Sequence, residues 1–192
     1  MTDLAERRDV ETEVYQPAED SRLLADAALD QVSAEHRVLE VGTGSGYVAD
    51  RVAEETGALV VASDLNPHAC RQASERGVRV VRGDLTEPFV DAAFDVVLFN
   101  PPYLPTGPDE EHDDWMEVAL SGGETGRVVI DPFLDGVGRV LRPGGFVLVL
   151  VSTVTGVDEV VERASENGFG AAAVADHSFP FETLTVLKLV RD

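Results

Sequence analysis

Strand patterns and helix patterns alternate along almost the whole chain, and this alternation most constrains how the chain can fold. The expected strands are Arg37–Val41, Leu59–Asp64, Val78–Arg82, Phe94–Phe99, Phe146–Val151, Ala171–Ala175 and Leu184–Val190. The expected helices are Pro17–Gln31, Tyr47–Glu55, Pro67–Arg76, Val128–Leu141 and Val157–Glu166. Parallel strands need a crossover connection, which is usually a helix. The pattern therefore predicts an α/β fold with a mostly parallel, seven-stranded, Rossmann-like sheet flanked by helices.

Length and composition limit the domain organisation. A chain of 192 residues can bury one sizeable core but is short for two ordinary domains, so we expect a single domain over residues 15–192. Residues 1–14 are polar and lack periodicity, which predicts a flexible N-terminal arm. The longest apolar run, Phe146–Val151, is far below the roughly 20 residues of a membrane span, and no secretory signal pattern opens the chain. We expect a cytoplasmic protein that does not enter a membrane.

Cysteine and histidine usage argues against disulfide and metal chemistry. Cys70 is the single cysteine, so it has no partner for an internal disulfide. The four histidines are scattered along the chain without the close spacing of metal ligands. We therefore expect no bound metal.

Acidic side chains dominate the charge of the chain. There are 36 Asp and Glu against 15 Lys and Arg, which gives a formal charge of -21, and Lys188 is the only lysine. Enzymes that act on nucleic acid usually carry a basic stripe that displaces counterions from phosphates, and no cluster of Arg or Lys supplies one here. Such acidity is typical of proteins from a salt-rich cytoplasm, where self-repulsion is screened. We predict a halophilic protein for which nucleic acid is an unfavourable partner.

A glycine-rich turn follows the first expected strand and leads into a helix. It reads Glu40-Val41-Gly42-Thr43-Gly44-Ser45-Gly46. Glycines let the backbone adopt positive φ and approach a ligand closely, and the free N–H groups at the helix start face the same crevice. A plain connection between a strand and a helix can look the same, so the turn by itself indicates a nucleotide site only weakly.

Two further features favour an adenosine-type ligand over NAD. The dinucleotide fingerprint requires its third glycine at the position that Tyr47 occupies. Asp64 ends the second strand, where a doubly wound fold places the acidic residue that binds a ribose hydroxyl, and Glu40 adds a second carboxylate. Asp84 follows the third strand and can accept from the exocyclic amine of adenine, although a turn aspartate is the alternative. The pattern predicts an adenosine-containing ligand without a pyrophosphate.

The segment Asn100-Pro101-Pro102-Tyr103 stands at the carboxyl end of the fourth strand, the edge at which open α/β sheets bind ligands. Its prolines remove two backbone donors, so the Asn100 side-chain oxygen and the Pro101 carbonyl can both accept from one NH₂ group. Tyr103 offers a face on which a flat group can stack. The segment predicts methylation of a planar amino or amide nitrogen by a sulfonium donor, although a rigid turn is the alternative.

Taken together, these motifs resemble the class I S-adenosylmethionine-dependent methyltransferases, and among them the HemK-like family, which methylates the glutamine amide of class I translation release factors. The resemblance spans nearly the whole chain, and it includes Val14-Tyr15-Gln16-Pro17-Ala18-Glu19-Asp20-Ser21, which is similar to the family's segment before the sheet. Gly122-Gly123-Glu124-Thr125-Gly126-Arg127 is similar to a family loop near the active site, although a turn before the next helix is the alternative.

The resemblance implies which residues perform the reaction and which bind the cofactor, S-adenosylmethionine. The implied catalytic residues are Asn100, Pro101 and Tyr103. The implied cofactor-binding residues are Tyr15, Pro17, Ser21, Glu40, Gly42, Gly44, Gly46, Asp64, Leu65, Asp84, Leu85 and Asn100.

The resemblance also implies protein partners. The chain lacks the separate N-terminal helical domain that binds the release factor in the bacterial branch. It is closer to the short eukaryotic and archaeal branch, which works with a small zinc-binding activator protein. We therefore expect a heterodimer, in which Val78–Arg82 is an open edge strand available for pairing.

Three other functions and one loop stay open. A DNA or RNA amino-methyltransferase suits the same turn, because adenine N6 and cytosine N4 are planar amines, but the charge disfavours it. A protein lysine methyltransferase and a non-catalytic nucleotide-binding protein are further alternatives. The loop after the turn attracts a basic protein substrate or is merely a solvated surface. Its acidic residues are Asp109, Glu110, Glu111, Asp113, Asp114 and Glu117.

Overall fold

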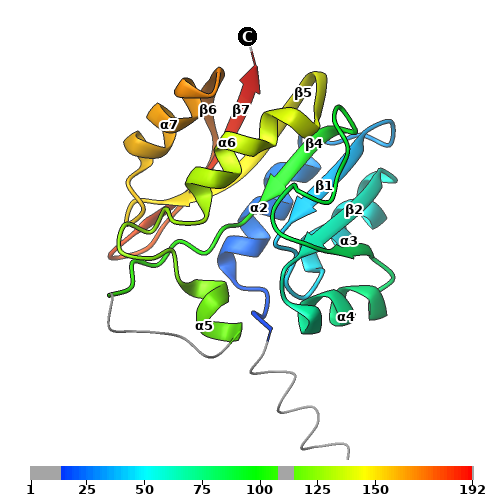
Figure 1. The fold of residues 1–192 in the computed structure, drawn as a ribbon, viewed down its shortest axis with the longest axis horizontal. Helices are drawn as coiled ribbons and strands as arrows, with labels where there is room; N and C mark the ends of the chain where they lie inside the picture. The colour runs from blue at the N-terminus through cyan, green and yellow to red at the C-terminus, as the bar shows by residue number, and fades with distance from the viewer. Residues whose placement is uncertain (1–13, 108–114, 192) are drawn as a thin grey trace, which may run out of the picture.

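The computed structural model describes residues 14–107 and 115–191, which form one sheet with helices on both faces (Figure 1). The strands in this part of the chain are β1 (Arg37–Val41), β2 (Leu59–Asp64), β3 (Arg79–Arg82), β4 (Phe94–Phe99), β5 (Leu141–Ser152), β6 (Phe169–Ser178) and β7 (Thr183–Arg191). Their order across the sheet is β3-β2-β1-β4-β5-β7-β6. Neighbours from β3 to β5 run parallel, whereas β7 is antiparallel to β5 and β6. The predicted sheet is confirmed.

The helices on the two faces bury two apolar cores. The helices are α2 (Glu19–Leu29), α3 (Tyr47–Thr56), α4 (Pro67–Glu75), α5 (Trp115–Leu120), α6 (Ile130–Val140) and α7 (Val157–Glu166). Successive strand residues point to opposite faces, so Val38 packs with α2 and α3 while Leu39 packs with α6 and α7. Both side chains are fully buried. A strand buried on both faces needs a continuous apolar run, which explains why β1 is evident in the sequence.

Most expected elements have nearly the same bounds in the structure. The bounds of β1, β2, β4 and α7 agree with the prediction. Those of α3, α4, β3 and β7 differ by one residue at one or both ends, and α6 begins two residues later and ends one residue earlier. Differences of this size are ordinary, because terminal hydrogen bonds fray.

Three predictions of element bounds are wrong by more, and one helix was not predicted. Helix α2 begins at Glu19 instead of Pro17, because Ala18 is extended, and it ends two residues early, at Leu29. Strand β5 begins at Leu141 instead of Phe146, with Arg142 to Gly145 bulging out between two paired stretches. Strand β6 is longer than the expected Ala171–Ala175, because it pairs along the length of β7. Helix α5 was not expected, since its six residues are too few to show a helical period.

Two predicted features lie wholly or partly outside the described residues. Residues 1–13 of the expected N-terminal arm lie outside the described residues. The acidic positions from Asp109 to Asp114 of the expected loop lie outside them as well. Val14, the last residue assigned to the arm, is described and is only 1% exposed. Over the described ranges, none of the helices is long and apolar enough to cross a membrane.

Candidate active site

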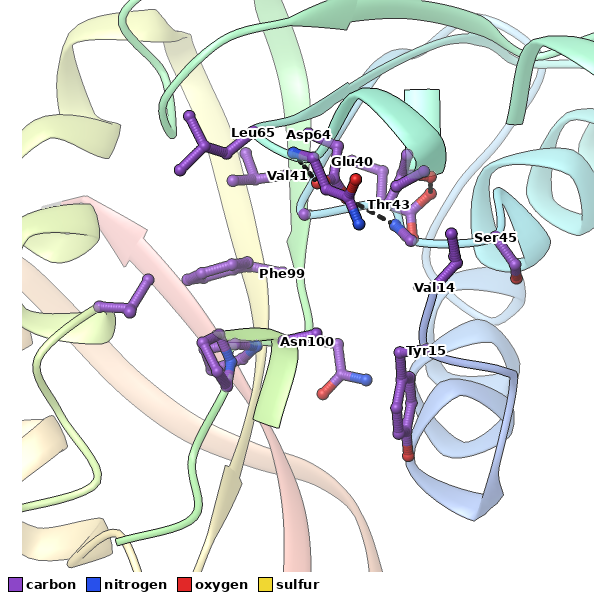
Figure 2. Close-up of a pocket in the computed structure, with 18 of the residues that line it drawn as sticks. Val14, Tyr15, Glu40, Val41, Thr43, Ser45, Asp64, Leu65, Phe99 and Asn100 are labelled. Carbon is purple, nitrogen blue, oxygen red and sulfur yellow. Dashed lines mark hydrogen bonds between the residues drawn. The ribbon is translucent and has the colours of Figure 1, made fainter. Parts of the chain in front are cut away.

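A cavity opens at the carboxyl ends of β1, β2 and β4, the edge at which the sequence predicts ligand binding (Figure 2). Residues far apart in the sequence line it, from the segment before α2 to the turn after β4. The predicted site residues that line the cavity are Tyr15, Pro17, Ser21, Glu40, Gly42, Gly44, Asp64, Leu65, Asp84, Leu85, Asn100, Pro101 and Tyr103. Gly46 is the predicted residue that does not.

The glycine turn after β1 has two separate tasks. Gly42, Gly44 and Gly46 all have positive φ, at 63°, 53° and 80°. Gly42 and Gly44 line the cavity, where they expose backbone to a ligand. Gly46 instead lies against α4, because a Cβ added to it would be 2.9 Å from Ala73 Cα. The structure therefore gives Gly46 a packing role in place of the cofactor contact that the resemblance implied. Only glycine lets α3 begin so close to α4.

Glu40 is a buried acid at the end of β1, beside the glycine turn. Its Oε2 accepts from the Thr43 hydroxyl at 2.5 Å and from the Ala49 N–H at 2.9 Å. Burial raises the pKa of Glu40 to about 8, against the lowering effect of these two hydrogen bonds, and the nearby Asp64 charge raises it further. The turn thus holds the carboxyl in place, and its raised pKa favours the protonated form more than in an exposed glutamate.

Asp64, at the end of β2, is fixed by backbone donors from two elements. Its Oδ2 accepts from the Gly44 N–H at 2.8 Å, and its Oδ1 accepts from the Asn66 N–H at 2.8 Å. Figure 2 shows Glu40 and Asp64 together above the turn. Burial raises the pKa of Asp64, and the hydrogen bonds from Asn66 and Gly44 oppose that rise. The structure therefore brings together the two carboxylates that the sequence assigned to an adenosine site.

The turn after β3 completes this half of the cavity. Leu85 has a φ of 42°, which is uncommon for a residue with a side chain, and its carbonyl accepts from the Ser63 hydroxyl at 3.2 Å. A Cβ added to the neighbouring Gly83 would be 2.1 Å from Pro88 Cγ, so this position also requires glycine. These restraints set the path on which Asp84 and Leu85 reach the cavity wall.

Asn100 follows β4, and only one end of its side-chain amide makes a hydrogen bond within the described residues. Its Nδ2 donates to Asp20 Oδ2 at 3.1 Å. Its Oδ1 is buried and has no hydrogen-bond partner within the described part of the chain. Figure 2 shows the nitrogen turned toward Tyr15. A buried acceptor without a donor is costly, so its presence at a cavity wall points to a ligand that donates.

Sequence reasoning missed Asp20 as a site residue, although it stands in the segment similar to the family's. Asp20 is 4% exposed and lines the cavity. Its Oδ1 accepts from the Ser21 N–H at 2.6 Å, and its Oδ2 accepts from the Tyr15 hydroxyl at 3.0 Å as well as from Asn100. No local signal separates Asp20 from its neighbour Glu19, because its partner in the site lies 80 positions away in the chain.

Two tyrosines stand beside this hydrogen-bond network. The pKa of Tyr15 is raised above its ordinary value, first by burial and then by the charge of Asp20 and the hydrogen bond to it. The pKa of Tyr103 is raised as well, by burial first and then by the charges of Asp20 and Glu182. Both phenols therefore stay neutral at physiological pH, and they offer aromatic faces and hydroxyl groups but no negative charge.

Helix α5 supplies a wall of the cavity that the sequence did not predict. Trp115, Val118 and Leu120 line the cavity from this helix. Its end is joined to the residue that follows the Asn100–Tyr103 turn, because the Leu104 N–H donates to the Leu120 carbonyl at 3.0 Å. The segment after Tyr103 is thereby held across the cavity.

The loop Gly122–Arg127 lies beside Tyr103, as the resemblance to a family loop implied. A Cβ added to Gly126 would be 2.7 Å from the Tyr103 carbonyl oxygen, so the loop backbone is in close contact with the turn. Arg127 Nη1 donates to the Thr155 carbonyl at 2.5 Å and ties the loop to the end of β5. The loop thus packs against the backbone of the Asn100–Tyr103 turn.

Comparisons with known proteins agree with this geometry. Residues 38–123 match the family described as a methyltransferase domain. A putative protein N5-glutamine methyltransferase of Methanocaldococcus jannaschii is 37% identical, over 93% of this chain and 92% of its own. The human methyltransferase HEMK2 is 32% identical, over 94% of this chain and 91% of its own. This chain belongs to the HemK-like methyltransferase family.

A solved structure extends the likeness of this HemK-like methyltransferase to three dimensions. It is that of the E. cuniculi Mtq2–Trm112 complex, which is described as responsible for methylation of the eRF1 translation termination factor. The matched chain has a TM-score of 0.78 and 31% identity, over 94% of this chain and 99% of its own.

S-adenosylmethionine is the cofactor of this HemK-like methyltransferase, and the residues present fit it. Gly42 and Gly44 expose backbone along the cavity, as close approach of a nucleoside requires. Asp64 and Glu40 place carboxyl groups for hydroxyl and amino donors. The unsatisfied oxygen of Asn100 marks the end of the cavity where a donor group is still needed.

Proposed function

We propose that this HemK-like methyltransferase transfers a methyl group to the glutamine side-chain amide of a class I translation release factor. The observation that carries the proposal is the buried, unpartnered Oδ1 of Asn100 in a cavity that otherwise fits S-adenosylmethionine. A primary amide presents two N–H donors in one plane and therefore suits an acceptor of this kind. The relatives support the choice of glutamine and of a release factor, since their names refer to N5-glutamine and to eRF1.

Asn100, Pro101 and Tyr103 are the catalytic residues of this proposal. The Asn100 Oδ1 and the Pro101 carbonyl accept from the two N–H groups of the substrate, which draws its nitrogen lone pair out of conjugation with the amide carbonyl. Tyr103 stacks on the flat amide and limits its orientation. S-adenosylmethionine, when bound, supplies an electrophilic methyl group on a sulfonium. With that group bound, the substrate nitrogen would take the methyl group from the sulfonium and would release its surplus proton to solvent.

The cofactor-binding assignments follow from the cavity wall. We assign this role to Tyr15, Pro17, Ser21, Glu40, Gly42, Gly44, Asp64, Leu65, Asp84, Leu85 and Asn100, all of which line it. Asp64 is suited to the ribose hydroxyls and Asp84 to the adenine amine. Gly46 is left out, because its contact is with Ala73.

The partner proposed from the family resemblance is a small zinc-binding activator protein. Strand β3 is at the edge of the sheet, and Val81 on it is 40% exposed, so this edge can pair with another chain. The structure of the E. cuniculi relative is of a complex with Trm112, which supports a heterodimer.

We further propose a single domain in a cytoplasmic, salt-adapted protein. A chain that is monomeric, soluble and fully active alone would contradict the heterodimer.

The decisive experiment incubates the protein, with its activator, with labelled S-adenosylmethionine and a release factor, duplex DNA or no substrate. We expect label on the release factor, with mass spectrometry locating it on one glutamine. Label on DNA would support the amino-methyltransferase alternative instead, and label on a lysine would support the lysine alternative.

Asn100→Ala tests the proposed acceptor directly. We expect kcat to fall by about 100-fold or more, because a preorganised hydrogen bond at the reacting group is lost, and this fall should be much larger than any loss of cofactor affinity measured by calorimetry. Asn167→Ala is the matched control, since Asn167 follows α7 and its side chain contacts Asp135, outside the cavity. Near-normal kcat in Asn100→Ala would contradict the role of the amide.

A further inference from the structure

Within the described residues, the Asn100 side-chain amide makes one hydrogen bond, and its partner belongs to α2. Asp20 Oδ2 accepts from Asn100 Nδ2 at 3.1 Å and from the Tyr15 hydroxyl at 3.0 Å. Asp20 Oδ1 accepts from the N–H and the hydroxyl of Ser21, at 2.6 and 3.2 Å. Every one of these contacts is made with a group that can donate, so both oxygens of Asp20 serve as acceptors. The first turn of α2 thus reaches across the cavity mouth to the end of β4.

We propose that Asp20 is a positioning residue that fixes the orientation of the Asn100 side-chain amide, with Nδ2 toward Asp20 and Oδ1 toward the substrate. It thereby makes the site selective for a neutral amide. This inference rests on the proposed function of Asn100. It assigns to Asp20 no contact with the reacting atoms; its effect passes through Asn100.

The orientation of an asparagine amide is not set by its shape, because its oxygen and nitrogen ends are nearly equal in size. A half-turn of the Asn100 side chain would put Nδ2 in the place of the unpartnered Oδ1, so a substrate amide would meet it as donor against donor. An ionised carboxylate excludes that half-turn, since it can only accept and would then face Oδ1, another acceptor. Asp20 therefore leaves Oδ1 as the end of the amide that has no partner in the described residues and can accept from a substrate.

The same contact strengthens Oδ1 as an acceptor. A charge-assisted hydrogen bond to one end of an amide polarises it and increases the negative charge on its oxygen, and a buried setting enhances the effect. Asp20 is 4% exposed, so water competes little for the contact. The neighbouring Tyr15 and Tyr103 have raised pKa values, through burial first and the charge of Asp20 next, and stay neutral beside it.

The test is Asp20→Asn, which keeps the shape of the side chain but can donate as well as accept. Both orientations of the Asn100 amide are then permitted. With the release factor as substrate, we expect kcat to fall by about 10- to 100-fold, the size typical of one lost charge-assisted hydrogen bond, with cofactor affinity within about threefold of the starting protein. The matched control is Asp26→Asn on the exposed side of the same helix, where Asp26 contacts Arg51 at 2.7 Å.

A second measurement separates orientation from general damage. A release factor carrying Glu in place of the methylated Gln is used as a competitive inhibitor. In the starting protein its carboxylate meets the acceptors Asn100 Oδ1 and the Pro101 carbonyl, so inhibition is poor. In Asp20→Asn the turned amide can donate to that carboxylate, so the inhibition constant should improve, relative to the KM of the Gln form, by about tenfold. A partly unfolded site would instead weaken the binding of the Gln and the Glu release factors by similar factors.

The outcomes for Asp20 and for the proposed function are distinguishable. If the starting protein does not methylate the release factor, the proposed function fails before Asp20 is tested. If the starting protein is active and Asp20→Asn keeps kcat within twofold with an unchanged preference between the Gln and Glu forms, the positioning role is wrong. Loss of cofactor binding in Asp20→Asn would also overturn it, because Asp20 would then act on the cofactor side of the cavity.

Discussion

Glu40 shows what burial does to a single polar side chain at the cavity wall. The carboxyl is 3% exposed, and its pKa is raised to about 8, mainly because the charged form loses its hydration. A folded-state pKa above the unfolded value means that the folded protein binds the proton more tightly. Cofactor binding and folding are therefore both linked to the protonation of this group.

We predict that Glu40 makes the cofactor-free protein less stable as pH rises. Its contribution is fully present below the ordinary pKa of 4.5 and is lost as pH rises through about 8. Glu40→Gln removes the titration, so the free energy of unfolding of the variant relative to the starting protein should increase between pH 5 and 9. Urea unfolding across this range measures it. Asp26→Asn, at an exposed carboxyl, serves as the control, and a pH-independent difference for Glu40→Gln would contradict the prediction.

At the scale of elements, helices α3 and α4 come into contact beside the site, and each contributes a residue to the cavity wall, Tyr47 and Ala69. Helix α4 begins with Pro67, and the Asn66 side chain accepts from the His68 N–H at 2.9 Å, so its start is well defined locally. Helix α3 begins at a glycine, Gly46, pressed against Ala73 of α4. The distance between the two helices at this point thus depends on the absence of a side chain at Gly46.

Gly46→Ala should therefore cost more stability than an ordinary glycine substitution. The positive φ alone costs about 1–2 kcal/mol for alanine, and displacing Ala73 adds a further cost of about 1–3 kcal/mol. Gly77→Ala is the matched control, because Gly77 has a φ of 91° and open space where a Cβ would stand. Urea unfolding of both variants measures the difference. Equal losses would show that the contact with Ala73 contributes nothing.

The whole molecule carries strong like charge. Its formal charge of -21 is opposed by few cations. Most ion pairs between described residues, such as Arg51 with Asp26, have at least one partner that is largely exposed, and Arg142 with Asp95 is the more buried exception. Exposed pairs of this kind stabilise proteins only weakly. Long-range repulsion among the acids therefore outweighs them at low salt, and salt reduces this repulsion by shortening the screening length.

We predict that Tm rises steeply between low and molar potassium chloride. Each kcal/mol of repulsion that salt removes should raise Tm by roughly 2–4 °C in a protein of this size. A triple variant with Gln at the exposed acids Glu54, Glu75 and Glu162 separates charge from general salt effects. It should melt higher than the starting protein at low salt and show a shallower dependence on salt. A Tm that does not respond to salt would contradict the prediction.

Much of this protein was determined by short stretches of sequence. Strands β1, β2 and β4 are apolar runs bounded by turn residues, so their limits were predicted correctly, and the ends of parallel strands necessarily share an edge. The Gly42, Asp64 and Asn100 positions follow from that rule alone, because each stands at such an end. Burial on both faces is a strong requirement, and it leaves a continuous signal in the chain.

Only the tertiary structure decided how these positions are completed. Asp20 meets Asn100 across 80 positions, α5 covers the cavity with six residues, and β6 extends along β7 by pairing rather than by its own pattern. Gly46 looks like its neighbours in the turn but packs on α4. A local sequence pattern indicates which helix or strand a residue belongs to and which of its faces is buried. The partner of a buried polar group, or the space beside a glycine, is set by chain segments that come together only on folding.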